Sequence, residues 1–179
     1  MRRTLTGACA AVLAALAVAG CGGSSSTTTA TDTWATGVCT AITTWQSQLT
    51  SIENTVKSGG VTKDSINKAV NQAKDATNQL ADSLKKLGKP DTQAGQQAKT
   101  DVQSLSDELS KGVKTIQDAV KGASGAAGIL SAVSTATGTL STMVTQVSTT
   151  VSDLQKLDPQ GELEKAFKSS SACKPLLGS

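Results

Sequence analysis

The stretch INKAVNQAKDATNQLADSLKKL, residues 66–87, decides the fold class of this chain. Its apolar side chains recur in steps of four and three, which places them along one stripe of an α-helix. The stripe consists of Ile66, Val70, Ala73, Thr77, Leu80, Leu84 and Leu87. Thr62 is placed to cap the start of this helix, while Gly88 and Pro90 end it. The pattern therefore predicts an amphipathic helix with one face to bury.

Three other stretches repeat this pattern. Helices are expected from Thr33 to Lys57, with Asp32 as the cap, from Thr92 to Lys121, and from Ala126 to Leu157. The first of these has the stripe Val38, Ile42, Trp45, Leu49, Ile52 and Val56. The next has Ala98, Val102, Leu105, Leu109, Val113, Ile116 and Val120. The last has Leu130, Val133, Thr137, Leu140, Val144, Val147, Val151 and Leu154.

The four stripes must bury one another, since no segment shows the period-two alternation of a strand. Short connections near residues 58–62, 88–91 and 122–125 force neighbouring helices to run antiparallel. The predicted fold is therefore all-α, an up-down-up-down four-helix bundle. The alternative is an extended helical hairpin that is completed only in a dimer.

A short C-terminal helix is expected after the fourth long one. Asp158 and Pro159 offer its cap and first helical residue, and its apolar residues are Leu163, Ala166 and Phe167. Trp34 lies at the same end of the bundle, and its expected packing partners are Leu87, Leu157 and Phe167.

The N-terminus ends an apolar run with Val18-Ala19-Gly20-Cys21, after the basic start Met1-Arg2-Arg3. These residues resemble the lipobox of bacterial lipoprotein precursors. The resemblance implies that diacylglycerol is attached to the Cys21 thiol and that a peptidase cuts before Cys21. Two or three acyl chains, such as palmitate, then hold the protein on a membrane stably.

This resemblance gives the chain three parts: a lipoprotein signal peptide at residues 1–20, a flexible Gly/Ser/Thr tether at 21–31, and the helical bundle domain at 32–179. The expected location is outside the cytoplasm, lipid-anchored to the cell membrane or to an outer membrane. Gly22 in place of Asp after the Cys favours the outer membrane in cells that have one.

Composition narrows the function. Loss of Arg2 and Arg3 with the signal leaves 15 Lys against 14 acidic residues, so the formal charge falls from +3 to +1 and gives no basis for binding nucleic acid. The mature chain lacks His, Arg and Tyr, which most enzyme active sites use. We expect no enzyme, no cofactor and no metal site.

Two cysteines remain once Cys9 is removed with the signal and Cys21 carries lipid. Exported thiols tend to pair, and the bundle brings the start of the first helix and the chain end to the same end of the molecule. We therefore predict a disulfide between Cys39 and Cys173.

Residue counting from the turns puts Trp45 level with three small side chains, Thr77, Gly112 and Thr137. This layer has two interpretations. It is plain packing, in which the indole fills a thin part of the core, or it is a ligand pocket with Trp45 as one wall.

The fourth helix carries no charged residue from Gly122 to Ser152. Ser, Thr and Gln interrupt this run too often for a membrane-spanning helix. Its Ser/Thr face is then a solvated surface, a docking face or a site for O-linked sugar.

The segment Trp34-Ala-Thr-Gly-Val-Cys-Thr-Ala-Ile42, with the late Cys173-Lys-Pro175, resembles small, uncharacterised helical exported proteins and lipoproteins of high-GC Gram-positive bacteria. No activity comes with that resemblance. Our first hypothesis is a non-enzymatic envelope lipoprotein that contacts another envelope protein through a helix surface. The alternative is a carrier for a small apolar ligand held between the helices.

Overall fold

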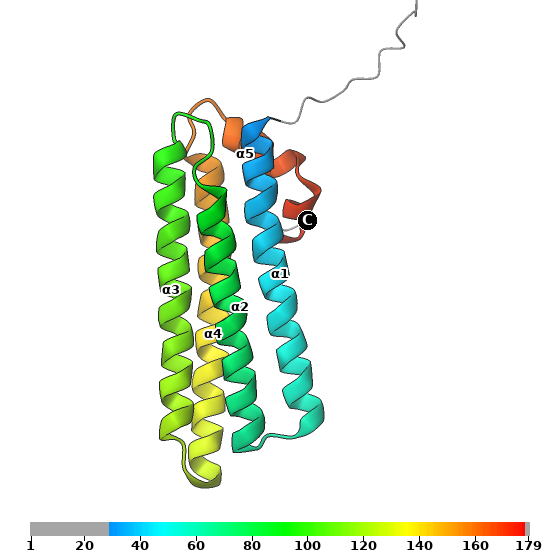
Figure 1. Ribbon diagram of the computed structural model, residues 1–179, viewed down its shortest axis with the longest axis vertical. Coiled ribbons are helices and arrows are strands. Elements are labelled where there is room, and N and C mark those ends of the chain that lie inside the picture. Colours follow the sequence, from blue (N-terminus) through cyan, green and yellow to red (C-terminus); the bar gives the residue numbers. More distant parts are fainter. Residues whose placement is uncertain (1–28, 178–179) are drawn as a thin grey trace, which may run out of the picture.

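The computed structural model describes residues 29–177, and it contains no strand in that range. Four long helices stand side by side and run alternately down and up (Figure 1). The helices are α1 (Ala30–Gly59), α2 (Lys63–Leu87), α3 (Gly95–Gly122), α4 (Gly125–Lys156), α5 (Glu162–Ser169) and the 3-10 helix η1 (Ser171–Leu176). The predicted all-α, up-down-up-down four-helix bundle with a short C-terminal helix is confirmed. One chain supplies all four long helices, so the alternative of a dimeric hairpin is wrong.

The stripes of α2 and α3 face inward as predicted. Ile66, Val70, Thr77, Leu80 and Leu84 are among the buried residues of α2. All seven stripe residues of α3, from Ala98 to Val120, are buried. The predicted cap of α2 is also correct, because Thr62 accepts from the backbone of Ser65 and forms a capping box with it.

The start of α1 differs from the prediction. Thr29, not Asp32, is the N-cap, and Asp32 is the third helical residue of a capping box. The Asp32 carboxylate accepts from the backbone N–H of Thr29 at 2.9 Å, and Thr29 Oγ1 accepts from the Asp32 N–H at 3.1 Å. A Thr-x-x-Asp pair thus satisfies two N–H groups at once, so the helix begins two residues inside the predicted tether.

Helix α3 begins three residues later than predicted. Pro90 is buried, and its carbonyl oxygen would lie 2.2 Å from a Cβ at Gly95. The loop therefore folds back onto the first turn of α3, and only glycine leaves room for this approach.

Helix α4 turns a different stripe inward from the one predicted. Leu130 is 68% exposed and Val144 is 41% exposed, and Thr137 is also exposed. The buried residues of α4 are instead Ala132, Met143, Val147, Val151 and Leu154. The C-terminal half of the predicted stripe is thus correct, and its N-terminal half is rotated toward the surface.

Asp158 caps α5 from a loop, and Pro159 is not helical. The Asp158 carboxylate accepts from the backbone N–H groups of Gln160 and Glu162 at 3.1 and 3.0 Å, while Gly161 is the residue next to the helix. The predicted cap is right in its chemistry, since its carboxylate reaches the first turn, but the helix starts later. The sequence patterns did not predict η1.

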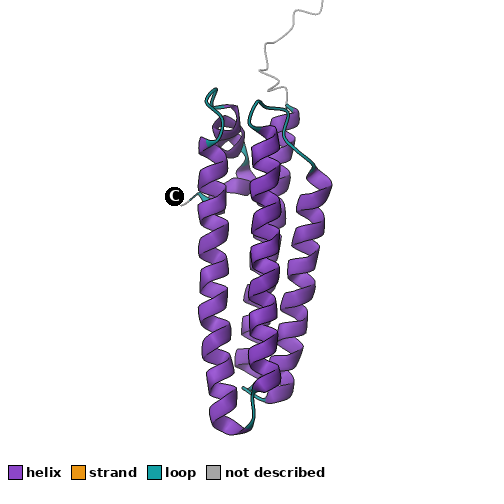
Figure 2. Ribbon diagram, turned by 90° about the vertical axis from the view of Figure 1, so that its left-hand side faces the viewer, coloured by secondary structure: helices purple, strands orange, loops and turns teal. Residues whose placement is uncertain are grey.

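The interior consists of two clusters. The upper core, at the end where α1 begins, combines α1, α2, α3 and α4 with Leu163, Ala166, Phe167 and Cys173 of the C-terminal segment. The lower core contains Ile66 and Val70 of α2, Ile116, Val120 and Ala123 at the end of α3, and Ala132 of α4. Among the α1 residues whose burial the structure describes, no buried residue belongs to the lower core. Figure 2 shows α5 and η1 beside the upper end of the bundle.

Candidate functional site

The predicted lipidation site, Cys21, and the predicted signal peptide at residues 1–20 lie outside the residues that the structure describes. The remaining candidates are the layer at Trp45, the disulfide and the surface of α4.

Trp45 and Thr77 meet in the core as predicted. The indole Nε1 donates to Thr77 Oγ1 at 3.1 Å, and the Thr77 hydroxyl donates to the carbonyl oxygen of Ala73 at 2.8 Å. Trp45 is 1% exposed and Thr77 is 2% exposed. Both polar groups therefore have partners in the core, as a buried indole and hydroxyl require.

The other two members of the predicted layer differ in their surroundings. Gly112 packs against α4, where a Cβ would approach Met143 Sδ to 2.8 Å. Thr137 is exposed and donates to the carbonyl oxygen of Val133 at 3.0 Å. The layer prediction is thus wrong for Thr137, because the α4 stripe is rotated. Met143 occupies the space that Gly112 leaves.

A surface groove of about 450 Å³ runs between α1 and α2 over one edge of Trp45. Its lining includes Gly37, Ala41, Ala76 and Leu87. Trp45 is among the residues that line this groove, together with Leu80 and Gln48.

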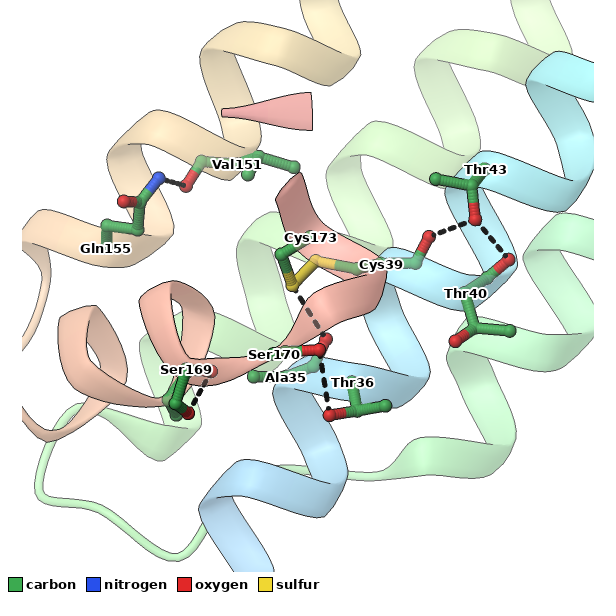
Figure 3. Close-up of a disulfide and its surroundings, with 11 residues drawn as sticks. Ala35, Thr36, Cys39, Thr40, Thr43, Val151, Gln155, Ser169, Ser170 and Cys173 are labelled. Atoms are coloured by element: carbon green, nitrogen blue, oxygen red, sulfur yellow. Dashed lines mark hydrogen bonds between the residues drawn. A yellow bond between two sulfur atoms is a disulfide. The ribbon is translucent and has the colours of Figure 1, made fainter. Parts of the chain in front are cut away.

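The predicted disulfide joins Cys39 of α1 to Cys173 of η1, with 4.9 Å between the Cα atoms (Figure 3). Both residues are fully buried. A hydrogen bond of 3.0 Å from the Thr36 hydroxyl to the Ser170 hydroxyl lies one turn away. At the same end, the rings of Trp34 and Phe167 meet edge to face with centroids 6.1 Å apart, which confirms one of the expected partners of Trp34.

The carboxyl groups with shifted pKa values belong to local surface pairs. The Thr29 backbone N–H, with its hydroxyl, holds the pKa of Asp32 below its usual value. Hydrogen bonds from Lys114 and Lys168 lower the pKa of Asp118 and the pKa of Glu164. Each partner lies three or four residues away, which is the spacing of ordinary helix-surface pairs. Within residues 29–177, no group of three or more His, Cys, Asp or Glu side chains is placed to hold a metal ion.

The most unusual surface is a stripe on α4 that we call the α4 face: Leu130, Val133, Thr137, Leu140 and Val144. Val133 and Leu140 are half-buried, and the other three are exposed. In the described part of the chain, α4 is also the one helix long and apolar enough to cross a membrane by length and composition. Its packing against α3 through Met143 and Val147 makes it part of the bundle.

No match was found to any known protein family, curated protein or solved structure. The α4 face therefore has to be interpreted from its own residues. The sequence pattern placed these residues in the core, and Val133 and Leu140 do pack against it, whereas Leu130, Thr137 and Val144 are exposed. The signal that would have corrected the last three is Ile129, Ala136 and Met143. They form an equally regular stripe with Val133 and Leu140.

Proposed function

We infer that this protein is a membrane-anchored envelope lipoprotein whose helical bundle acts by binding another protein and not by catalysis. The observation that carries this proposal is the α4 face, which exposes Leu130 and Val144 on a helix without charged residues from Gly122 to Ser152. Large exposed apolar side chains on an uncharged helix favour contact with a partner over contact with water alone.

The disulfide supports a location outside the cytoplasm. Cys39 and Cys173 lie 134 residues apart in the sequence and are paired in the core. Disulfides of this structural kind form and persist in oxidising compartments and are rare in the cytosol. This agrees with the export that the lipobox resemblance implies.

An anchor at Cys21 would fix which end of the bundle lies near the membrane. Thr29 is the eighth residue after Cys21, so even a fully extended chain between them spans about 28 Å. The upper end, which holds the start of α1 together with α5 and η1, would therefore stay close to the lipid. The α4 face would begin near the far end of the bundle, where α4 starts, and would reach only about the middle of α4.

The test is site-specific photocrosslinking on intact cells. A photoreactive amino acid at Val144 is expected to give a crosslinked protein product, whereas one at Asn71, an exposed residue of α2, is expected to give none. In parallel, a fatty-acid probe should label the wild type and not Cys21→Ser. Equal crosslinking from both positions would remove the role of the α4 face, and normal labelling of Cys21→Ser would remove the anchor.

The second candidate is a carrier for a small apolar ligand. The observation in its favour is the groove over Trp45, whose walls include the apolar side chains of Ala41, Ala76 and Leu80. A saturable change in tryptophan fluorescence during a lipid and metabolite screen, abolished by Trp45→Ala, would favour the carrier over the interaction module.

A further inference from the structure

We propose that the groove between α2 and α3 binds a phosphate group, which lysines from both walls hold between them. We call it the α2–α3 groove. Its volume is about 330 Å³, and its lining includes Lys74 of α2 with Lys114 and Lys121 of α3. This site is separate from the α4 face, so it stands whether or not the proposed function holds.

The α2–α3 groove carries a net positive charge, although the chain as a whole is close to neutral. Three lysines line it, and Asp118 is the one carboxylate among its lining residues, so its net formal charge is +2. Lys114 donates to that carboxylate at 2.8 Å. Among the described residues, Lys74 and Lys121 form no salt bridge and can face an anion from solvent. A phosphate monoester carries about −1.5 to −2 charges at pH 7 and would balance them.

The sequence of α2 repeats the basic edge of this groove. Lys63-Asp-Ser-Ile-Asn67 and Lys74-Asp-Ala-Thr-Asn78 share the pattern Lys-Asp-x-x-Asn and start 11 residues apart. Eleven residues are about three helical turns, so the two copies lie on the same side of α2. Lys63 shows that this side faces α3, because its Nζ donates to the carbonyl oxygen of Ala123 at 2.9 Å.

The acidic residues of α2 are kept off this edge. An Asp follows each Lys of the repeat and is therefore rotated by about 100° around the helix. Asp75 accordingly lines the groove that α2 forms with α1, on the other side of the helix. The edge toward α3 thus presents Lys and Asn without a carboxylate between them, which leaves its positive charge available to a ligand.

Helix α3 supplies the opposite wall with the same chemistry. Lys114 and Lys121 are seven residues apart, which is about two helical turns, so they share one edge of α3. Ser110 and Gln117 line the groove on the same edge, and Asn78 lines it from α2. These uncharged side chains add hydrogen-bond donors between the lysines. The groove therefore combines cations with neutral donors on both walls.

The placement of the charges favours phosphate over carboxylate. The lysines come from two walls, and each ammonium group is a point charge without the planar fork of arginine. A phosphate directs its oxygens tetrahedrally and can accept from both walls at once, whereas a carboxylate presents two oxygens in one plane. Lysine commonly binds phosphate in this way. No aromatic side chain lines the groove to stack on a base, so a nucleic acid is not the expected carrier of the phosphate.

The position of the groove indicates where the phosphate comes from. Lys121 lies beside the last residue of α3, at the lower end of the bundle, and Lys74 lies near the middle of α2 (Figure 1). An anchor at Cys21 would hold the opposite, upper end near the lipid. We therefore expect the phosphate of a soluble molecule and not that of a lipid headgroup.

The experiment uses the chain from Gly22 to Ser179 without the signal, which contains every residue that the structure describes. Amide resonances are followed by NMR while sodium phosphate replaces sodium chloride at constant ionic strength. Saturable shifts are expected at Asn78 and Gln117. Replacing both Lys74 and Lys121 by Gln should weaken phosphate binding by about tenfold, because two close charges are lost. 

A matched control removes the same charge elsewhere. Lys68→Gln with Lys111→Gln changes one exposed lysine on each of the same two helices, outside the groove lining, and should leave phosphate binding nearly unchanged. All four lysines are exposed, so each double variant should keep the helical circular dichroism of the wild type. If the groove variant does not fold, Lys121→Gln alone replaces it, with Lys111→Gln as its control.

Two further titrations, with short-chain inorganic polyphosphate and with phosphatidylglycerol vesicles, identify the carrier. Polyphosphate binding that the groove variant loses and the control variant keeps would support the site and a soluble carrier. Vesicle binding with the same dependence would support the site and assign its phosphate to a lipid headgroup. Three results would overturn the proposal: no saturable shift with phosphate, equal loss of binding in both double variants, or the same shifts with sodium acetate at the same concentration.

Discussion

Removing the Cys39–Cys173 crosslink is expected to lower the free energy of unfolding by up to about 5 kcal/mol. The bond closes a loop with a sequence separation of 134 residues, and the chain-entropy relation gives roughly that value for such a loop. Measured crosslinks often contribute less, so this is an upper figure. It is comparable to the whole stability of many domains, which is about 5 to 15 kcal/mol.

The assay is guanidinium chloride unfolding, followed by circular dichroism at 222 nm, of the oxidised protein and of protein refolded with a reductant. Comparison of one sequence in two redox states leaves the side-chain volumes in the core nearly unchanged. Serine or alanine variants would add a buried hydroxyl or a cavity. With a slope of about 4 kcal/mol per M, a loss of 5 kcal/mol moves the midpoint by about 1.2 M.

The structure also predicts which segment loosens first in the reduced protein. Helix α5 buries Leu163, Ala166 and Phe167 in the upper core, whereas Cys173 is the buried residue of η1. Hydrogen exchange should therefore rise first in residues 171–176, before α5. Coincident midpoints for the two redox states would refute the entropic argument, and simultaneous exposure of α5 and η1 would show that the bond holds the whole C-terminal segment.

Three further predictions test the core and the first cap. Met143→Ala should lower the free energy of unfolding by about 2 to 5 kcal/mol, because Met143 is 1% exposed, while Val144→Ala should lower it by under about 1 kcal/mol. Thermal unfolding of both variants at low micromolar concentration tests this. A larger loss for Val144→Ala than for Met143→Ala would favour the stripe that was first predicted. Thr77→Val should lower the free energy of unfolding by about 1 to 3 kcal/mol, because the buried indole N–H of Trp45 loses its acceptor. A loss no larger than that caused by Thr→Val at an exposed position would contradict this. The pKa of Asp32 is lowered in the folded state, so its contribution to stability is complete above its usual pKa near 4 and is lost as the pH falls through the lowered value. Asp32→Asn should flatten this acid dependence, as measured by unfolding at pH 2 to 6.

Much of the fold follows from the sequence alone. On α2 and α3, charged residues mark the outer face at nearly every turn, so one apolar stripe is defined and the inward residues are predicted correctly. The disulfide also follows, because antiparallel helices with short turns bring Cys39 and Cys173 to one end of the bundle.

The orientation of α4 could not be read in this way. Without charges from Gly122 to Ser152, two stripes compete: one through Leu130 and Val144, the other through Ala132 and Met143. Steps of four and three fit both stripes, and the prediction followed the first. In the folded protein the second stripe is buried, because α3 leaves space at Gly112 for Met143.

The composition of the Trp45 layer likewise depended on the tertiary structure. Counting residues from the turns gives a height along the bundle, and this height correctly paired Trp45 with Thr77. Height does not give the direction in which a side chain points, and Thr137 points outward.

The repeat of apolar residues within each helix determined the helices and their order, since it is a local property of the chain. Which side of α4 meets solvent was decided only when α4 packed on α3, because the space at Gly112 and the Met143 side chain that fills it belong to different helices.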